Sequence, residues 1–380
     1  MAENNQKPKI IEKPRKYTNY SLVIFLGLVL LGALAIALVY NLAFVNYYVD
    51  LNLYAFSAIT VFGGYFTSVS LYYLGKLIFG KIAGFRLINF TFFFTRFVKS
   101  DNGIKVLPSS FEGLGCKLNM APSKDNPNYK LYLFGGTIFS APFFLIALVL
   151  FCVLDKTTQL KYYLLFIFSY IPFIIAGNLI PLRMDDYNEG FLLRLIKKEG
   201  VEKWYRNLHQ LEALTNSSST LQYYEISGDD LTPFDLDGLY YNYYYALDHD
   251  ENTRCNNVCE ALIYNVQNIV DLSKVYCGYA GKIYSYCKQK RFDEADRFLQ
   301  EIKSEYRSTI KSKRRYESLK VSLYLDAYVE SNYDDYLARY FSKEKLAKHY
   351  KYLTRVEKEE KLVEQTIANI QKDHPDWYVK

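Results

Sequence analysis

The chain has 380 residues, of which 50% are hydrophobic, and a formal net charge of +6 at pH 7. Its mean hydropathy is nevertheless only −0.10, so very apolar stretches must be balanced by a strongly polar remainder. No apolar run of membrane-spanning length follows about Arg183, and the excess positive charge flanks the runs before it. This distribution favours membrane topology over nucleic-acid binding as the reason for the charge, and we expect no nucleic-acid partner.

Four apolar runs predict four membrane-spanning helices, because each is long enough at about 1.5 Å per residue to cross a hydrocarbon core of about 30 Å. The expected helices cover residues of about 22–45, 52–75, 131–154 and 162–182. The first run is too long for a signal-peptide core and lacks an obvious cleavage site, so we expect it to remain as an anchor. The predicted fold class is an α-helical polytopic membrane protein with a small interfacial β-element and an all-α cytoplasmic domain.

Charge predicts the orientation of these helices. The N-terminal tail, residues 1–21, and the connection between the second and third runs are both rich in Lys and Arg, which places them on the cytoplasmic side. Four crossings return the chain to that side. We therefore expect a multi-pass protein of the plasma membrane, embedded in the lipid bilayer, with both termini in the cytoplasm. Its membrane domain would cover residues 22–190 and its cytoplasmic helical domain residues 191–380.

The connection between the second and third runs opens with residues 85–98, which are rich in aromatic and β-branched side chains. This composition predicts a strand or hairpin at the membrane interface. Asp101-Asn102-Gly103 is a turn signal, and residues 104–107 could form the returning strand. An amphipathic interfacial segment that binds no ligand is an equally supported alternative.

The end of the second run carries the most informative motif. Residues 72–80 read Tyr-Tyr-Leu-Gly-Lys-Leu-Ile-Phe-Gly, which resembles the H-E-x-G-H-x-x-x-G helix of the site-2 protease family of intramembrane zinc metalloproteases. The two histidines of that motif fall on Tyr72 and Lys76, and its glutamate falls on Tyr73. Zinc binding and water activation need two imidazoles four residues apart and a glutamate base, which phenols and an ammonium group cannot replace. The resemblance therefore implies a retained fold, a lost hydrolytic centre and no zinc cofactor.

A second match lies at the end of the fourth run. The family has N-x-x-P followed by D-G, whose aspartate is the third zinc ligand; here Asn178 and Pro181 are present, and Glu189-Gly190 stands in place of Asp-Gly. Gly135-Gly136 resembles a third segment of the family. The resemblance covers residues of about 62–190. Asp185 and Asp186 are alternative occupants of the carboxylate position, so the candidate binding or ion-pair residues are Lys76, Asn178, Pro181, Asp185, Asp186 and Glu189.

Lys76 allows two arrangements, because a charged group inside a spanning helix costs about 2.5–3.5 kcal/mol near the bilayer centre unless it is paired or reaches water. In the first, its ammonium group replaces the charge of zinc and pairs with Glu189, Asp185 or Asp186. In the second, which we favour slightly, Lys76 reaches the cytoplasmic face and the acidic residues are solvated.

Histidine and cysteine spacing supports no other metal site. The histidines, His209, His249, His349 and His374, all follow the last apolar run and show no ligand spacing. Six cysteines are expected to stay reduced in the cytoplasm. Cys255 and Cys259 are one helical turn apart, but their spacing to Cys277 and Cys287 fits no standard zinc ribbon, so we expect buried structural thiols.

The C-terminal half has a helical pattern with few breaks after Asn257. Within it, Tyr279, Ile283 and Tyr286 and then Phe292, Ala295, Leu299 and Ile302 follow the spacing of a tetratricopeptide-like helix pair. Such repeats commonly bind peptides or partner proteins in a groove, although plain helical packing without a ligand is equally supported here.

The sequence thus predicts a catalytically degenerate homologue of an intramembrane metalloprotease. It would bind a membrane-embedded or peptide partner in peptide maturation, export or signalling, with a small peptide, a membrane protease or a transporter as its partner. One alternative is an active membrane metalloprotease with non-standard metal ligands. Another is a membrane scaffold or immunity-type protein that acts through its cytoplasmic helical domain.

Overall fold

The computed structural model describes residue 27 and residues 62–100, 103–109, 115–155, 159–181, 187–216, 219–226, 231–266, 269, 272–311, 316–350 and 354–377. The described chain forms two compact units, with the division after residue 208. The first unit contains a helix, a small sheet and a group of further helices. Its elements are α3 (Gly64–Ile82), β1 (Phe85–Phe92), β2 (Thr95–Ser100), β3 (Gly103–Pro108), β4 (Cys116–Pro122), α4 (Tyr129–Val153), α5 (Gln159–Phe168), α6 (Ile171–Leu179), α7 (Glu189–Glu199) and the start of α8 (Val201–Thr215).

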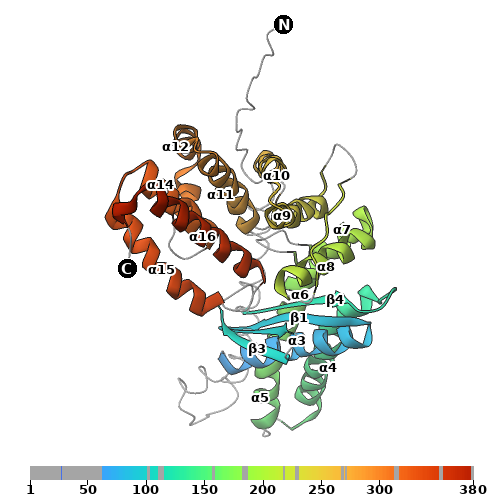
Figure 1. Cartoon of the computed structure of the whole chain (residues 1–380). Coiled ribbons are helices and arrows are strands. Elements are labelled where there is room, and N and C mark those ends of the chain that lie inside the picture. The colour runs from blue at the N-terminus through green and yellow to red at the C-terminus, as the bar shows by residue number, and fades with distance from the viewer. Residues whose placement is uncertain are drawn as a thin grey trace. The chain divides into compact units, whose positions relative to one another are not determined.

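The four strands form one sheet in the order β3-β2-β1-β4. β1 pairs antiparallel with β2, with Phe90 opposite Phe97, and antiparallel with β4, with Phe90 opposite Leu118. In Figure 1, α3 runs along one face of this sheet. The prediction of β-structure in this connection is confirmed, because its alternation of aromatic and β-branched residues fits a half-buried pleated surface.

Helices α3 and α4 pack antiparallel through glycines. A side chain at Gly75 would collide with Phe139, and one at Gly135 would lie 2.6 Å from Cβ of Phe79. At Gly136, an added Cβ would lie 2.8 Å from the ring of Tyr72. Small residues at these positions therefore let the two backbones approach closely, as they do in many helix pairs of membrane proteins.

The prediction of four membrane-spanning helices is wrong. Among the described residues, one helix, α4, is long and apolar enough to cross a membrane. Two lysines and several Ser, Thr and Tyr residues make α3 too polar, and the fourth predicted helix is broken near Ser169 into the short helices α5 and α6. The prediction counted apolar residues without the local breaks. The first predicted helix, residues 22–45, and residues 52–61 of the second lie outside the described residues.

The described elements after residue 208 are all helices, as the sequence predicts, and residues 219–226 are described as a non-helical segment between α8 and α9. The second unit contains the end of α8, a 3₁₀ turn (Pro375–Trp377) and eight further helices: α9 (Pro233–Asp248), α10 (Asn252–Tyr264), α11 (Leu272–Lys288), α12 (Phe292–Glu301), α13 (Ser304–Ile310), α14 (Tyr316–Tyr328), α15 (Tyr333–Tyr350) and α16 (Thr354–Asp373). Helices α11 and α12 occupy the segment with tetratricopeptide-like spacing, and peptide binding by this pair stays a prediction. α7, expected in the cytoplasmic domain, lies in the first unit.

A buried charge pair lies in the core of the second unit. Nζ of Lys320, on α14, is 2.5 Å from Glu359 on α16 and donates a hydrogen bond to the Tyr243 hydroxyl on α9 at 2.9 Å. Both charged side chains are essentially inaccessible to water. The pair therefore ties three helices together from inside the core.

Candidate functional site

The centre of the candidate site is an ion pair between Lys76 on α3 and Glu189 at the start of α7. Both side chains are buried, with exposed fractions of 10% for Lys76 and 5% for Glu189. The Lys76 ammonium group also lies 5.2 Å from the centre of the Tyr132 ring on α4, at cation–π distance. The structure therefore has the ion pair. The arrangement that the sequence slightly favoured, with Lys76 at the cytoplasmic face and solvated acidic residues, is wrong for Glu189, because both side chains are buried against each other.

The other two motif positions of α3 lie on the same buried side of the helix. Tyr72, Tyr73 and Lys76 are all buried, which follows from their spacing of three and four residues along a helix. The rings of Tyr72 and Tyr73 meet edge to face at 5.6 Å. The Tyr72 ring also packs against the position of Gly136 on α4. The site thus joins two phenols, one ammonium group and one carboxylate in a protein interior.

The position of Glu189 is set by its neighbour Asn188. The Asn188 side chain accepts a hydrogen bond from the backbone N–H of Phe191 at 2.9 Å, which caps the start of α7. Its amide nitrogen donates to the carbonyl oxygens of Gly177 at 2.9 Å and Ile180 at 2.6 Å, at the end of α6. One asparagine therefore fixes the start of α7 against the end of α6, and Glu189 follows as the first helical residue, where a carboxylate suits the helix dipole.

Gly190 permits this approach of α6 and α7. A Cβ at position 190 would collide with the carbonyl group of Leu179, which is backbone and cannot move aside. The small residue after Glu189 is therefore required by the geometry. A glycine at this position is also what the D-G motif of the resembling family has.

The remaining predicted site residues are not part of the charge pair. Asn178 is buried, and its amide nitrogen donates to the carbonyl oxygen of Ile174 at 2.8 Å within α6. Pro181 follows α6 and is exposed. Asp185 and Asp186 lie outside the described residues. The structure therefore brings together Lys76 and Glu189, with Tyr72 and Tyr73 on the same side of α3.

Sequence reasoning missed two residues of this site. Asn188 carried a usable signal, because Asn directly before an acidic residue and a helical pattern is a common helix start. Tyr132 lies one helical turn before Gly136, and Gly136 packs against Tyr72, so its face of α4 could have been inferred from the glycine pair. Its contact with Lys76 depends on the tertiary packing of α3 on α4.

The residues present fit a zinc ion poorly. A protonated lysine has no lone pair to donate, and the single carboxylate is already paired with it. Among the residues that the structure describes, no group of three or more His, Cys, Asp or Glu side chains could hold a metal ion. This arrangement can keep a buried pair of opposite charges in a fixed geometry. Its side chains include no group suited to activating water.

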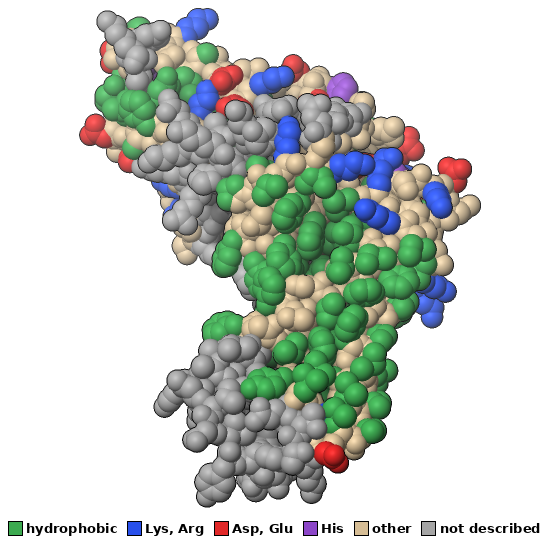
Figure 2. All heavy atoms as spheres, turned by 90° about the horizontal axis from the view of Figure 1, so that it is seen from below, with side chains coloured by type: hydrophobic (Ala, Val, Ile, Leu, Met, Phe, Trp, Pro, Cys, Tyr) green, Lys and Arg blue, Asp and Glu red, His purple; other side chains and the backbone are tan. Residues whose placement is uncertain are grey.

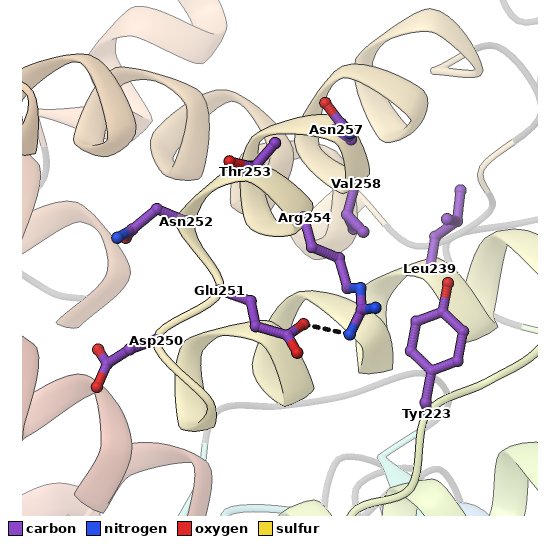
Figure 3. A pocket seen from close by; sticks show the side chains of 9 residues that line it. All are labelled: Tyr223, Leu239, Asp250, Glu251, Asn252, Thr253, Arg254, Asn257 and Val258. Atoms are coloured by element: carbon purple, nitrogen blue, oxygen red, sulfur yellow. Dashed lines mark hydrogen bonds and ion pairs between the residues drawn. The ribbon is translucent and has the colours of Figure 1, made fainter.

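A hollow of about 780 Å³ lies in the helical unit. As Figure 3 shows, the Arg254 guanidinium group points toward the Tyr223 ring, 4.9 Å from its centre, and pairs with Glu251. Asn252 and Asn257 add polar groups to the same lining. Its size is that of a small-ligand site, but its lining is mostly polar and exposed, and it carries no arrangement of a nucleophile and a base.

Comparisons of the chain with protein-family models, with curated proteins and with solved structures found no match. The resemblance to site-2 proteases therefore rests on the sequence motifs and stays a prediction. Three helices that carry those motifs, α3, α4 and the start of α7, contribute Lys76, Tyr132 and Glu189 to this charged centre.

Proposed function

We propose that this chain is a non-hydrolytic relative of the site-2 proteases that binds a peptide partner through its first unit. The observation that carries this proposal is the contact between Lys76 and Glu189. In the family pattern these two positions are zinc ligands from separate segments, which must converge on one ion. Here they are 113 residues apart in sequence and form a buried ion pair.

The glycines of the motifs support the same relationship. Gly136 lies against Tyr72, at the position of the family's first histidine, and Gly190 lies against the end of α6. Each is needed for a close approach of two backbones around the charge pair. The glycines of these motifs therefore share one structural role, which is to let backbones approach closely around the charge pair.

The charge balance explains how such a centre persists without a metal. A buried carboxylate needs a positive partner, because an isolated buried charge is expensive. The Lys76 ammonium group supplies that positive charge in the place where the family has zinc. Neither the Lys76 ammonium group nor the Tyr73 phenol can act as the general base that a metalloprotease requires. We therefore propose peptide binding as the function.

The sheet offers a place for an extended peptide. Among the described strands, β3 is last in the sheet order, next to β2, and its side chains Ile104 and Val106 are exposed by 62% and 61%. An apolar edge strand is a ready template for a further strand, in which backbone hydrogen bonds and alternate side chains hold the ligand. The partner we propose is therefore an extended peptide with apolar side chains at alternate positions.

Restoring the motif tests the relationship. We expect the variant Tyr72→His, Tyr73→Glu, Lys76→His, Glu189→Asp to bind close to one zinc ion per chain, because two imidazoles four apart would face a carboxylate. A matched variant with Glu189→Leu in place of Glu189→Asp should bind at least about tenfold more weakly. Zinc is measured by competition with a chromophoric chelator. A folded four-site variant that binds no zinc would contradict the kinship.

Peptide binding is tested by site-specific photo-crosslinking. The probe is a biotinylated synthetic peptide that alternates Val and Thr, and the photoreactive residue replaces Val106 on β3. The control places it at Phe341 on α15, which is apolar and 54% exposed. We expect crosslinking at position 106 to exceed that at position 341 severalfold. Equal yields at the two positions would argue against an edge-strand site.

Two other functions are separated by simple measurements. Near-stoichiometric zinc in the unmodified protein would favour an active metalloprotease with non-standard ligands. A scaffold role through the helical unit is favoured by the hollow around Arg254 and Tyr223 (Figure 3). In that case Arg254→Glu, in the full chain, would abolish recovery of a co-purifying partner, whereas Val106→Asp on β3 would leave it unchanged.

A further inference from the structure

Basic side chains gather on the small sheet of the first unit. Its four described strands carry five Lys or Arg residues and no Asp or Glu; the five are Arg86 on β1, Arg96 and Lys99 on β2, Lys105 on β3 and Lys117 on β4. The segments between the strands add two acidic residues, Asp101 and Glu112, so residues 85–122 carry a formal charge of +3, five positive charges less two negative ones. A ligand that pairs with this sheet therefore enters a positive environment.

The two ends of the described strand order differ in exposure. Five of the seven residues of β4 are buried, and the Tyr132 hydroxyl of α4 donates to the carbonyl oxygen of Leu118 on this strand at 3.4 Å. Four of the six residues of β3 are exposed. The described part of the sheet thus leaves room for an extended ligand beside β3 rather than beside β4.

Apolar and basic side chains alternate along β3. Ile104 and Val106 lie on one face of the strand, and Lys105 between them lies on the other, because successive side chains of a strand point to opposite faces. The side chains of a ligand strand alternate in the same way, and those across from a residue of β3 lie on its face, about 5 Å away. Ligand side chains at alternate positions therefore meet Ile104 and Val106, and the one between them meets the Lys105 ammonium group.

The basic residues of β2 lie within electrostatic range of the same ligand. Neighbouring strands are about 4.8 Å apart, so a ligand strand beside β3 lies about 10 Å from β2, which carries Arg96 and Lys99. The Debye length at 0.1 M salt is also about 10 Å. Lys105 therefore acts on the ligand directly, and Arg96 and Lys99 add a weaker attraction for negative charge.

The exposed apolar surface of the helices selects a ligand less sharply. Figure 2 shows hydrophobic side chains gathered on one face of the molecule, with few charged side chains among them. Large exposed apolar residues of the first unit include Leu74 and Ile78 on α3 and Ile146 and Val149 on α4. Burial of such surface is non-directional, whereas charge complementarity gives specificity. β3 combines apolar and basic groups on a single strand and can therefore select a ligand by both properties.

We propose that the peptide bound at β3 alternates apolar and acidic side chains, with the acidic ones on the face of Lys105. This inference rests on the peptide binding proposed above and adds the charge of the ligand. Carboxylates at these positions would pair with Lys105, whereas ammonium groups there would be repelled by the basic residues of β2 and β3.

Three biotinylated peptides of equal length test the charge preference; they alternate Val with Glu, Thr or Lys. Each is crosslinked to the full chain in a neutral detergent through the photoreactive residue at position 106, with position 341 as the background. We expect the Val–Glu peptide to crosslink at least about fivefold more than the Val–Lys peptide, since one cross-strand charge pair changes affinity by up to about fivefold. The Val–Thr peptide should lie between them. In 1 M NaCl, where the Debye length is about 3 Å, the yields of the charged peptides should approach each other.

A charge reversal on β3 identifies the residue that selects the ligand. Lys105→Glu should remove or reverse the preference for the Val–Glu peptide. The control Lys130→Glu replaces an exposed lysine on α4, changes the net charge by the same amount and should keep the order found for the unmodified chain. The Val–Thr peptide has no charged side chain, so it reports whether β3 of each variant still binds a peptide.

The outcomes separate this inference from the proposed function. Equal yields of the Val–Glu and Val–Lys peptides at position 106, each above the yield at position 341, would overturn the inference and leave binding at β3 standing. Yields no higher at position 106 than at position 341 with any peptide would contradict the proposed function and this inference with it. A crosslinked dimer of the chain at position 106 without peptide would also overturn the inference, because a second copy would then occupy β3.

Discussion

Removing the positive partner of Glu189 is the sharpest perturbation that the first unit offers. The variant Lys76→Met keeps the volume of the side chain and deletes its charge. Surface ion pairs are worth about 0–1 kcal/mol, but the exposed fractions of 10% and 5% place this pair in the interior. Breaking a buried pair on one side typically costs about 3–5 kcal/mol, because the other charge stays buried without compensation. We expect a loss of stability in that range.

The double variant Lys76→Met, Glu189→Leu should recover most of the loss. Replacing both members of a buried pair by apolar groups is often neutral or stabilising, so the two single changes should be strongly non-additive. As a control, Lys81→Met removes an exposed lysine from the same helix and should change stability by no more than about 0.5 kcal/mol.

Tryptophan fluorescence reports unfolding of this unit. The sequence has two tryptophans, and Trp377→Phe leaves Trp204 as the single reporter. Trp204 is buried and stacks on Tyr132 at 6.2 Å, the same ring that lies beneath the Lys76 ammonium group. Denaturant titration in detergent gives the free energy of unfolding. A Lys76→Met variant within about 1 kcal/mol of the parent, or a double variant as unstable as the single one, would refute the reasoning.

Three further predictions follow from steric, charge and titration arguments. Gly190→Ala should destabilise the first unit by about 1–3 kcal/mol or more, because the added Cβ would collide with backbone atoms. The control Gly177→Ala has open space around the added Cβ and should be neutral or slightly stabilising. Unfolding of both variants is followed by Trp204 fluorescence. Lys320→Met should cost the helical unit about 3–5 kcal/mol in a thermal melt followed by circular dichroism, and adding Glu359→Leu should restore most of it. Burial raises the pKa of Asp326 from 3.8 to about 6. The folded state therefore keeps a proton that the unfolded state has lost, so stability from this group should fall as pH rises from about 4 to about 6. Asp326→Asn should flatten that slope in melts recorded across this range; an unchanged slope would exclude this carboxyl as its source.

Local signals explain what could be predicted from the sequence. The aromatic and β-branched residues of 85–98 are placed in β1 and β2, and the turn signal ending at Gly103 precedes β3. These preferences act between neighbouring residues, so they survive in the folded chain. A local signal of the same kind, the Thr232–Asp235 capping box, marks the start of α9, which carries the tyrosine-rich residues 240–245.

Composition alone did not decide how many helices could cross a membrane. The fourth apolar run has the residues of a spanning helix, but the chain breaks near Ser169, whose hydroxyl donates to Phe166 O, and resumes with Pro172 in the first turn of α6. A hydropathy average cannot register such a break, because it counts residues without their backbone hydrogen bonds. Among the residues that the structure describes, only α4 has the expected length.

The sequence by itself determined the chemistry available at the centre of the first unit: two phenols and an ammonium group at positions 72, 73 and 76, without imidazole. Tertiary structure decided which carboxylate met that ammonium group, since Glu189 is 113 residues away and reaches it through the Asn188 contacts with α6. The physical reason is that the two properties depend on different distances along the chain. Side-chain identity sets what a group can donate or accept, while the pairing of distant buried charges depends on the close packing of α3 on α4 and of the start of α7 on the end of α6, which glycines permit.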